Sequence, residues 1–108
     1  MPSVFHSSIF TLKKATFSAE QAQALAAKCL DHVDGIVSLH AGLSAGPSGK
    51  DTDGTETVTF GLVVRVLTEQ HAAALRRHHA FVALINYLHT HSTKAKVSVD
   101  FTALHSGL

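Results

Sequence analysis

The sequence is poor in charged, cysteine and large aromatic residues. It has no tryptophan, one cysteine and one tyrosine among 108 residues, and 16% of its residues are charged. The formal net charge of +1 leaves no broad positive field, so nucleic acids and anionic membranes are not expected partners. No apolar run approaches the roughly eighteen residues that span a bilayer. The N-terminal positive charges follow the apolar stretch, the reverse of a signal peptide, which predicts a soluble cytoplasmic protein.

The single cysteine is expected to be a packing residue. Cys29 cannot form a disulfide within the chain, and its spacing from Ala22, Leu25 and Ala26 places it on the apolar face of a helix. Reactive thiols need exposure and a positive environment, which such a face does not provide. The sequence therefore predicts a small buried hydrophobe rather than a nucleophile.

Hydrophobic periodicity predicts strands and helices within a single domain that spans residues 1–108. Alternating apolar residues indicate strands, and apolar stripes at i, i+3, i+4 and i+7 indicate helices. The expected strands are 3–12, 35–42, 57–67 and 94–101, and the expected helical regions are 17–33 and 69–89. The residues of the last strand that are expected to face inward are Val97, Val99 and Phe101.

Local signals set the ends of these elements. Ser18 and Gln21 have the spacing of a capping box, and Thr68 can cap the second helical region, which is expected to break near His78. Residues 43–57 are rich in glycine, serine and aspartate and have almost nothing to bury. They predict a flexible loop within the domain.

The order β-α-β-β-α-β predicts an α+β fold of the ferredoxin-like kind, in which both helical regions cover one face of an antiparallel four-stranded sheet. The strands nevertheless carry apolar residues on both faces, for example Phe5 and Ile9 on one side and Phe10 and Leu12 on the other. An apolar sheet face left in water favours aggregation, so a second subunit is expected to cover it. The sequence thus predicts a homodimer that pairs through sheet faces.

Three stretches resemble the stress-responsive dimeric α/β-barrel (Dabb) domains: VFHSSIFTLKK, DHVDGIVSLHAG and KVSVDF. They match that family's opening strand with its histidine, its helix-to-strand turn and its closing strand, and the resemblance covers nearly all of residues 4–101. It implies two ferredoxin-like subunits whose sheets face each other to form a dimeric barrel.

The resemblance also implies where catalytic residues would lie. The His-Pro-Ala-His segment of many members becomes HHAF here, so that His78 matches the first histidine and Phe81 replaces the second, which is the general base of the family's plant polyketide cyclases. The cyclase tyrosine falls on Leu75, and a further histidine falls on Phe60. Only His6 remains of the family's pocket histidines.

The other histidines are not expected to bind a metal or a cofactor. His78 and His79 diverge by about 100° on a helix, so they cannot both face one ion. No acidic residue or cysteine completes a chelate with His71 and His78. Arg76 and Arg77 are expected to lie on a solvated helix face rather than to form an anion site.

Related folds bring two further possibilities. RNA-recognition motifs share the element order, but the third strand offers only Phe60 for base stacking. Haem-degrading monooxygenases share the barrel, but the chain has no tryptophan for their usual pocket wall.

A ligand pocket around His6 is the remaining candidate site, although His6 can equally be a packed core or interface histidine. The residues expected to line such a pocket are His6, Ser8, Phe10, Ser38, His40, Phe60, Leu75, His78 and Phe81. Two hypotheses follow. The sequence favours a non-enzymatic dimeric barrel that holds at most a small apolar ligand between sheet and helices. The alternative is a cofactor-independent cyclase or monooxygenase with His6 as general base and His40 or His78 as helper.

Overall fold

The computed structural model describes residues 3–45, 49–94 and 96–102, and it has the predicted ferredoxin-like α+β order with one strand added. The elements are β1 (Val4–Lys13), α1 (Ala19–His32), β2 (Ile36–Leu43), β3 (Gly49–Lys50), β4 (Glu56–Val66), α2 (Glu69–Arg77), α3 (His79–Thr90) and β5 (Val97–Thr102).

The sheet is antiparallel and has five strands rather than the four expected. Its order is β2-β4-β1-β5, and β3 pairs with β4 beside this path. The extra strand pairs Gly49 with Thr57 and Lys50 with Glu56, and it lies inside the segment 43–57 for which a flexible loop was predicted. Residues 46–48 of that segment, and residue 95 of the expected last strand, lie outside the described residues.

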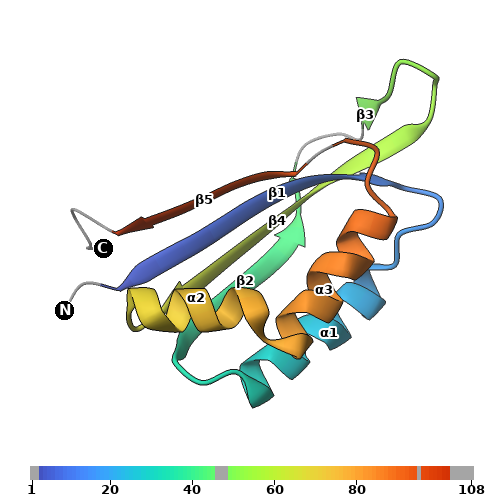
Figure 1. The fold of residues 1–108 in the computed structure, drawn as a ribbon. Coiled ribbons are helices and arrows are strands. Elements are labelled where there is room, and N and C mark those ends of the chain that lie inside the picture. Colours follow the sequence, from blue (N-terminus) through green and yellow to red (C-terminus); the bar gives the residue numbers. More distant parts are fainter. Residues whose placement is uncertain (1–2, 46–48, 95, 103–108) are drawn as a thin grey trace.

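The helices lie together on one face of the sheet, as Figure 1 shows. Helix α1 packs on α3 and β2, while α2 packs on α3, β1 and β4. No described element covers the opposite face, which we call the open face. No helix in the described ranges is long and apolar enough to cross a membrane.

The hydrophobic core fills the layer between the helices and the two central strands, β1 and β4. Its fully buried large side chains are Phe10, Leu12, Leu62, Val64, Val66, Cys29, Leu75, Leu84 and Leu88. The predicted burial of Cys29 is confirmed, since its side chain is 0% exposed, and burial raises the pKa of its thiol. A raised pKa leaves little thiolate at neutral pH, which suits a packing role.

The helix ends follow the predicted signals. The Ser18 hydroxyl accepts from the Gln21 N–H, and the Thr68 hydroxyl accepts from the His71 N–H. The predicted break is also confirmed: His78 has extended backbone angles (φ −70°, ψ 133°) between α2 and α3, and its Nδ1 accepts from the Ala80 N–H. Each capped end satisfies backbone donors that lack partners within the helix.

The predicted orientation of the last strand is wrong. Val97, Val99 and Phe101 lie on the open face, where they are 67%, 55% and 45% exposed. The register of β5 on β1 places Asp100 opposite His6, so the polar side chains of β5 face the helices instead. Residues directly opposite each other in an antiparallel pair share a face of the sheet, and this fixes the orientation of the whole strand.

Gly35 joins α1 to β2 at a position that only glycine fits. Its φ is +83°, and a Cβ atom there would collide with the ring of His71. That ring is itself held by a 2.8 Å hydrogen bond between its Nδ1 and the Thr68 hydroxyl. Gly54 has nearly the same φ, +85°, but open space around it.

Replacement of Gly35 by alanine should therefore destabilise the protein more than the same change at Gly54. Both changes carry the cost of a positive φ, about 1–2 kcal/mol. Gly35→Ala adds the displacement of His71, so its free energy of unfolding in urea should be the lower of the two. Equal losses would show that His71 moves aside freely.

Candidate functional site

His6 is the centre of a hydrogen-bonded network between the sheet and the helices. Its Nδ1 lies 2.5 Å from Asp100 Oδ1, and its Nε2 lies 3.1 Å from Ser8 Oγ. Ser8 Oγ is in turn 2.9 Å from Ser98 Oγ. The second carboxylate oxygen of Asp100 accepts a hydrogen bond from the Arg76 guanidinium. The network therefore joins β1, β5 and α2.

The register of two strands assembles this network. His6 and Ser8 are two residues apart on β1 and share the helix-facing side, and β5 places Asp100 and Ser98 directly opposite them. His6 is 4% exposed and Ser8 is 0% exposed. The edge of the His6 ring meets Phe81 of α3, with 5.4 Å between ring centroids. The buried polar groups are thus satisfied by each other.

The carboxylate of Asp100 orients the His6 ring. A neutral His6 that donates from Nδ1 to Asp100 leaves Nε2 to accept from the Ser8 hydroxyl. This connectivity is that of a serine, histidine and aspartate triad. A nucleophile must reach its substrate, however, and Ser8 is fully buried. The geometry therefore provides an oriented histidine but not an accessible serine nucleophile.

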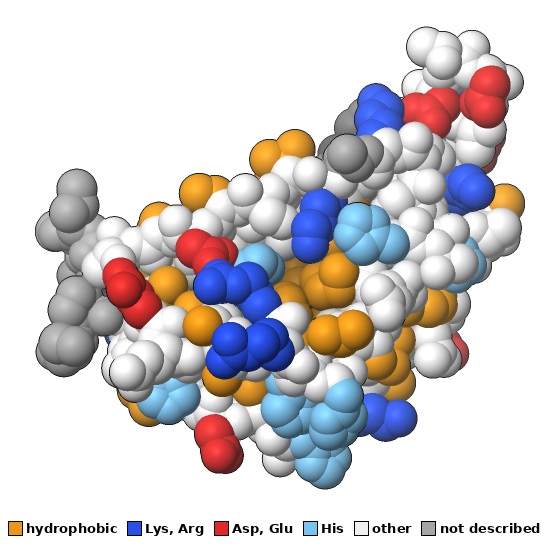
Figure 2. Space-filling view, viewed as in Figure 1, with side chains coloured by type: hydrophobic (Ala, Val, Ile, Leu, Met, Phe, Trp, Pro, Cys, Tyr) orange, Lys and Arg blue, Asp and Glu red, His pale blue; other side chains and the backbone are white. Residues whose placement is uncertain are grey.

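A cavity of about 360 Å³ adjoins this network beside α3. Its lining residues are His6, Arg76, Phe81, Val82, Ile85, Asn86, His89 and Lys96. We call it the α3 cavity. Phe81, Val82 and Ile85 give it an apolar wall, and Arg76 and Lys96 give it two cations. Figure 2 shows apolar side chains between basic and histidine side chains on this face of the molecule.

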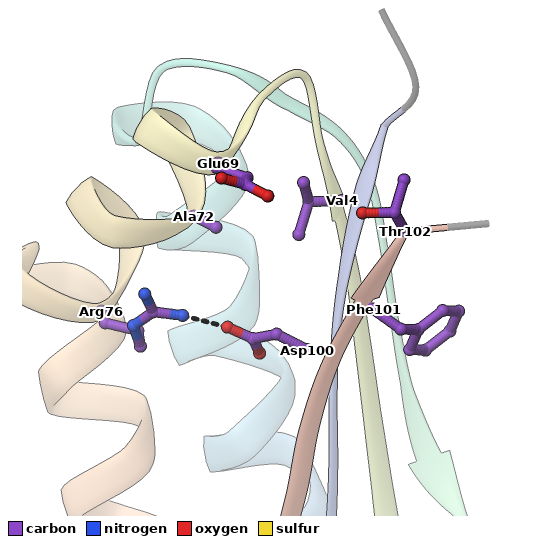
Figure 3. A pocket seen from close by; sticks show the side chains of 7 residues that line it. All are labelled: Val4, Glu69, Ala72, Arg76, Asp100, Phe101 and Thr102. Carbon is purple, nitrogen blue, oxygen red and sulfur yellow. Dashed lines mark hydrogen bonds and ion pairs between the residues drawn. The ribbon is translucent and has the colours of Figure 1, made fainter.

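A second cavity, of about 320 Å³, lies beside α2. Its lining residues are Val4, Glu69, Ala72, Arg76, Asp100, Phe101 and Thr102. We call it the α2 cavity. Arg76 lines both cavities. In Figure 3, Arg76 and Asp100 point toward each other across the space between α2 and β5, with Glu69 and Ala72 on one side of the pair.

The structure brings together only part of the predicted pocket. Of the nine expected residues, His6 and Phe81 line the α3 cavity. Four others lie buried on the same side of the sheet: Ser8, Phe10, Phe60 and Leu75. Phe60 instead lines a third cavity, of about 220 Å³, between α1 and β2.

Three of the residues expected in the pocket lie elsewhere in the structure: Ser38, His40 and His78. Strand β4 separates β2 from β1, and the register places Ser38 opposite Arg65 and His40 opposite Val63 on the open face. His40 therefore cannot assist His6 within one chain. His78 caps α3 and stacks on His79, with ring centroids 4.5 Å apart, and it does not line the α3 cavity.

Sequence reasoning missed the charged half of the site. The sequence predicts a solvated face for Arg76. Because Val97, Val99 and Phe101 are expected to face inward, the alternation predicts that Lys96 and Asp100 face solvent. The available signal was the pairing of polar with polar residues, because His6 and Ser8 on β1 match Asp100 and Ser98 on β5. The described residues contain no group of three or more histidine, cysteine or acidic side chains that could hold a metal ion.

Comparison with solved structures shows the same fold in other proteins. A protein of unknown function from Nitrosomonas europaea matches with a TM-score of 0.73 and 18% identity over 100% of this chain and 95% of its own. A dimeric ferredoxin-like protein of unknown function from Thermobifida fusca has a TM-score of 0.71 and 16% identity over 94% and 92% of the two chains. A Dabb family protein with a ferredoxin-like fold from Mesorhizobium loti has a TM-score of 0.68 and 19% identity over 97% and 100%.

These similarities show a shared fold and no more, because the identities are low. No protein-family model matches the sequence, and no curated protein matches it either.

Loss of the Asp100 side chain should destabilise the protein more than loss of its partner Arg76. Asp100→Ala leaves the buried Nδ1 of His6 without its acceptor, so the free energy of unfolding should fall by about 1–3 kcal/mol. Arg76→Ala removes a partner whose side chain is 48% exposed, and such ion pairs contribute about 0–1 kcal/mol. Urea unfolding measures both. An equal effect of the two variants would contradict the central place of the His6 contact.

Proposed function

We propose that the chain is one subunit of a homodimeric α/β barrel of the stress-responsive type, and that each subunit binds a small, mainly apolar acid in the α3 cavity. The observation that carries the proposal is the composition of that cavity, an apolar wall next to two cations and an oriented histidine. Pockets of this kind hold a ligand by its apolar body and fix its orientation by a few polar contacts.

The open face of the sheet supports the dimer. Ile9, Val97 and Val99 are more than half exposed on neighbouring strands, which makes one continuous apolar surface. Phe5 and Phe101 stack beside them with ring centroids 5.1 Å apart. A sheet face of this kind is stabilised by burial against an equivalent face.

Arg65 adds a polar argument for the same interface. Its guanidinium lies over the Phe5 ring, 5.8 Å from the centroid, on the open face. Its Nε is buried and has no hydrogen-bond partner within the described part of the chain. A second subunit could provide the missing acceptor. The similar protein from Thermobifida fusca is described as dimeric, which also supports the pairing.

The chemistry of the α3 cavity supports an acidic ligand. Arg76 can bind a carboxylate through two parallel hydrogen bonds, and Lys96 adds a second positive charge. The only carboxylate in the network, Asp100, is already bonded to Arg76 and His6. Phe81, Val82 and Ile85 can then contact an apolar ring or chain.

A charge on the open face should prevent dimer formation. Ile9→Lys places an ammonium group at the centre of the proposed interface, where its desolvation would be unfavourable. The matched control is Leu30→Lys, because Leu30 is 50% exposed on α1 and Ile9 is 51% exposed. Light scattering should give a dimer for the wild type and the control and a monomer for Ile9→Lys. A monomeric wild type would refute the interface.

The ligand preference can be tested with two small molecules of the same shape. We expect 2-naphthoate to bind more tightly than neutral 2-naphthalenemethanol, by about tenfold or more, because only the acid gains charge-assisted hydrogen bonds. NMR titration should show shifts at Val82, Ile85 and Asn86. Equal affinities, or shifts confined to the open face, would count against the proposed site.

A second function is supported by the hydrogen bond between His6 and Asp100. A histidine that is oriented by a carboxylate at a cavity wall can act as a general base, so the chain could be a cofactor-independent enzyme that removes a proton from a polyketide-like or aromatic substrate. Nε2 must then exchange its Ser8 contact for the substrate.

Proton abstraction can be followed without knowledge of the natural product. An enzyme should accelerate the exchange of the methyl protons of 2-acetonaphthone in heavy water, and His6→Gln should abolish the acceleration while the dimer persists. If the wild type leaves the exchange at its uncatalysed rate while the wild type and His6→Gln both bind 2-naphthoate, the enzyme hypothesis is wrong and only the binding function remains.

A further inference from the structure

Arg76 lies between two neighbouring cavities, the α3 cavity and the α2 cavity, because it is a lining residue of both. Its guanidinium reaches from the last turn of α2 to Asp100 on β5, as Figure 3 shows. The ion pair therefore lies across the boundary between the two spaces.

At this boundary the long side chain of Arg76 lies beside the small side chain of Ala72. Ala72 lies four residues before Arg76 on α2, so the two share a helix face, and Ala72 lines the α2 cavity. An alanine at this position leaves the space beside the guanidinium unfilled. Removal of the Arg76 side chain would consequently join the cavities of about 320 and 360 Å³.

The ion pair can open without disturbing the rest of the network. The Arg76 and Asp100 side chains are 48% and 32% exposed, and solvent weakens such a pair. Asp100 keeps its bond to His6 through the other oxygen when Arg76 leaves. A ligand carboxylate in the α3 cavity can thus replace Asp100 as the partner of the guanidinium.

We propose that Arg76 determines the specificity of the site in two respects: it selects the charge of the ligand and it limits the length of the ligand. It provides the cation that binds the acid, and its side chain closes the α3 cavity against molecules that extend toward α2. This inference rests on the proposed ligand site, and it assigns the selection to one residue.

Three variants separate charge from length. Arg76→Ala removes both the charge and the barrier, whereas Arg76→Gln removes the charge and keeps a polar side chain of intermediate length. Arg77→Ala is the matched control, because Arg77 is its exposed neighbour on α2 and lines neither cavity. The ligands are 2-naphthoate, which is short and anionic, and 4-biphenylmethanol, which is long and neutral. Calorimetry gives the dissociation constants, and NMR shifts give the location.

Both Arg76 variants should bind 2-naphthoate about tenfold or more weakly than the wild type, because each lacks the bidentate cation. Arg76→Ala should bind 4-biphenylmethanol about fivefold or more tightly than the wild type and Arg76→Gln do, since an additional apolar ring is then buried. Its shifts should include Ala72 and Thr102 as well as Val82. Arg77→Ala should bind both ligands as the wild type does.

Each failure has a separate meaning. If 2-naphthoate does not bind the wild type at all, the proposed ligand site is wrong. If it binds but Arg76→Gln leaves its affinity unchanged, Arg76 does not select charge. If Arg76→Ala binds 4-biphenylmethanol no better than Arg76→Gln does, Arg76 does not limit length. Either of the last two results overturns the inference while the proposed ligand site stands.

Discussion

The register of β5 on β1 is the constraint on which the site depends. It places two polar residues of one strand opposite two polar residues of the other, so that His6 meets Asp100 and Ser8 meets Ser98 on the helix-facing side. A shift of one residue would turn the polar side chains of β5 outward and bring Val97, Val99 and Phe101 under the helices. The buried histidine would then lose its acceptor. The hydrogen bonds of His6 and the apolar open face are therefore two results of one register.

The same register explains why the polar and ionisable groups of the site lie on the helix-facing side of the sheet and an apolar surface lies on the other side. The helices close over a layer that is apolar around Phe10 and Leu62 and becomes polar toward β5. The transition occurs at the edge of the sheet, where side chains are partly exposed, so charged residues such as Arg76 and Lys96 can remain solvated. An edge position thus allows cations to face a cavity without the cost of full burial.

Most of the fold could be predicted from the sequence because local signals decide it. The capping residues Ser18 and Thr68, the break at His78 and the alternation in β1 and β4 depend only on neighbours in the chain. The site could be predicted only in part, because it depends on contacts between distant segments. His6 was recognised, but its partner is 94 residues away, and the exposed, alternating pattern of β5 fits either orientation. Ser38 and His40 were misplaced because the strand order, which puts β4 between β1 and β2, was not part of the local pattern.

The break at His78 has a consequence for how the protein can change over evolutionary time. Because one extended residue divides the helical layer, α2 and α3 are two short helices. Ala72 of α2 lines only the α2 cavity and Val82 of α3 lines only the α3 cavity, while Arg76 lines both. A substitution at Ala72 reshapes only the space beside α2, and one at Val82 reshapes only the space beside α3. The core residue Leu84 is two positions from Val82, lies on another face of α3 and is not required to change. Descendants of such a chain can acquire new ligands by independent steps, with the folded scaffold kept intact.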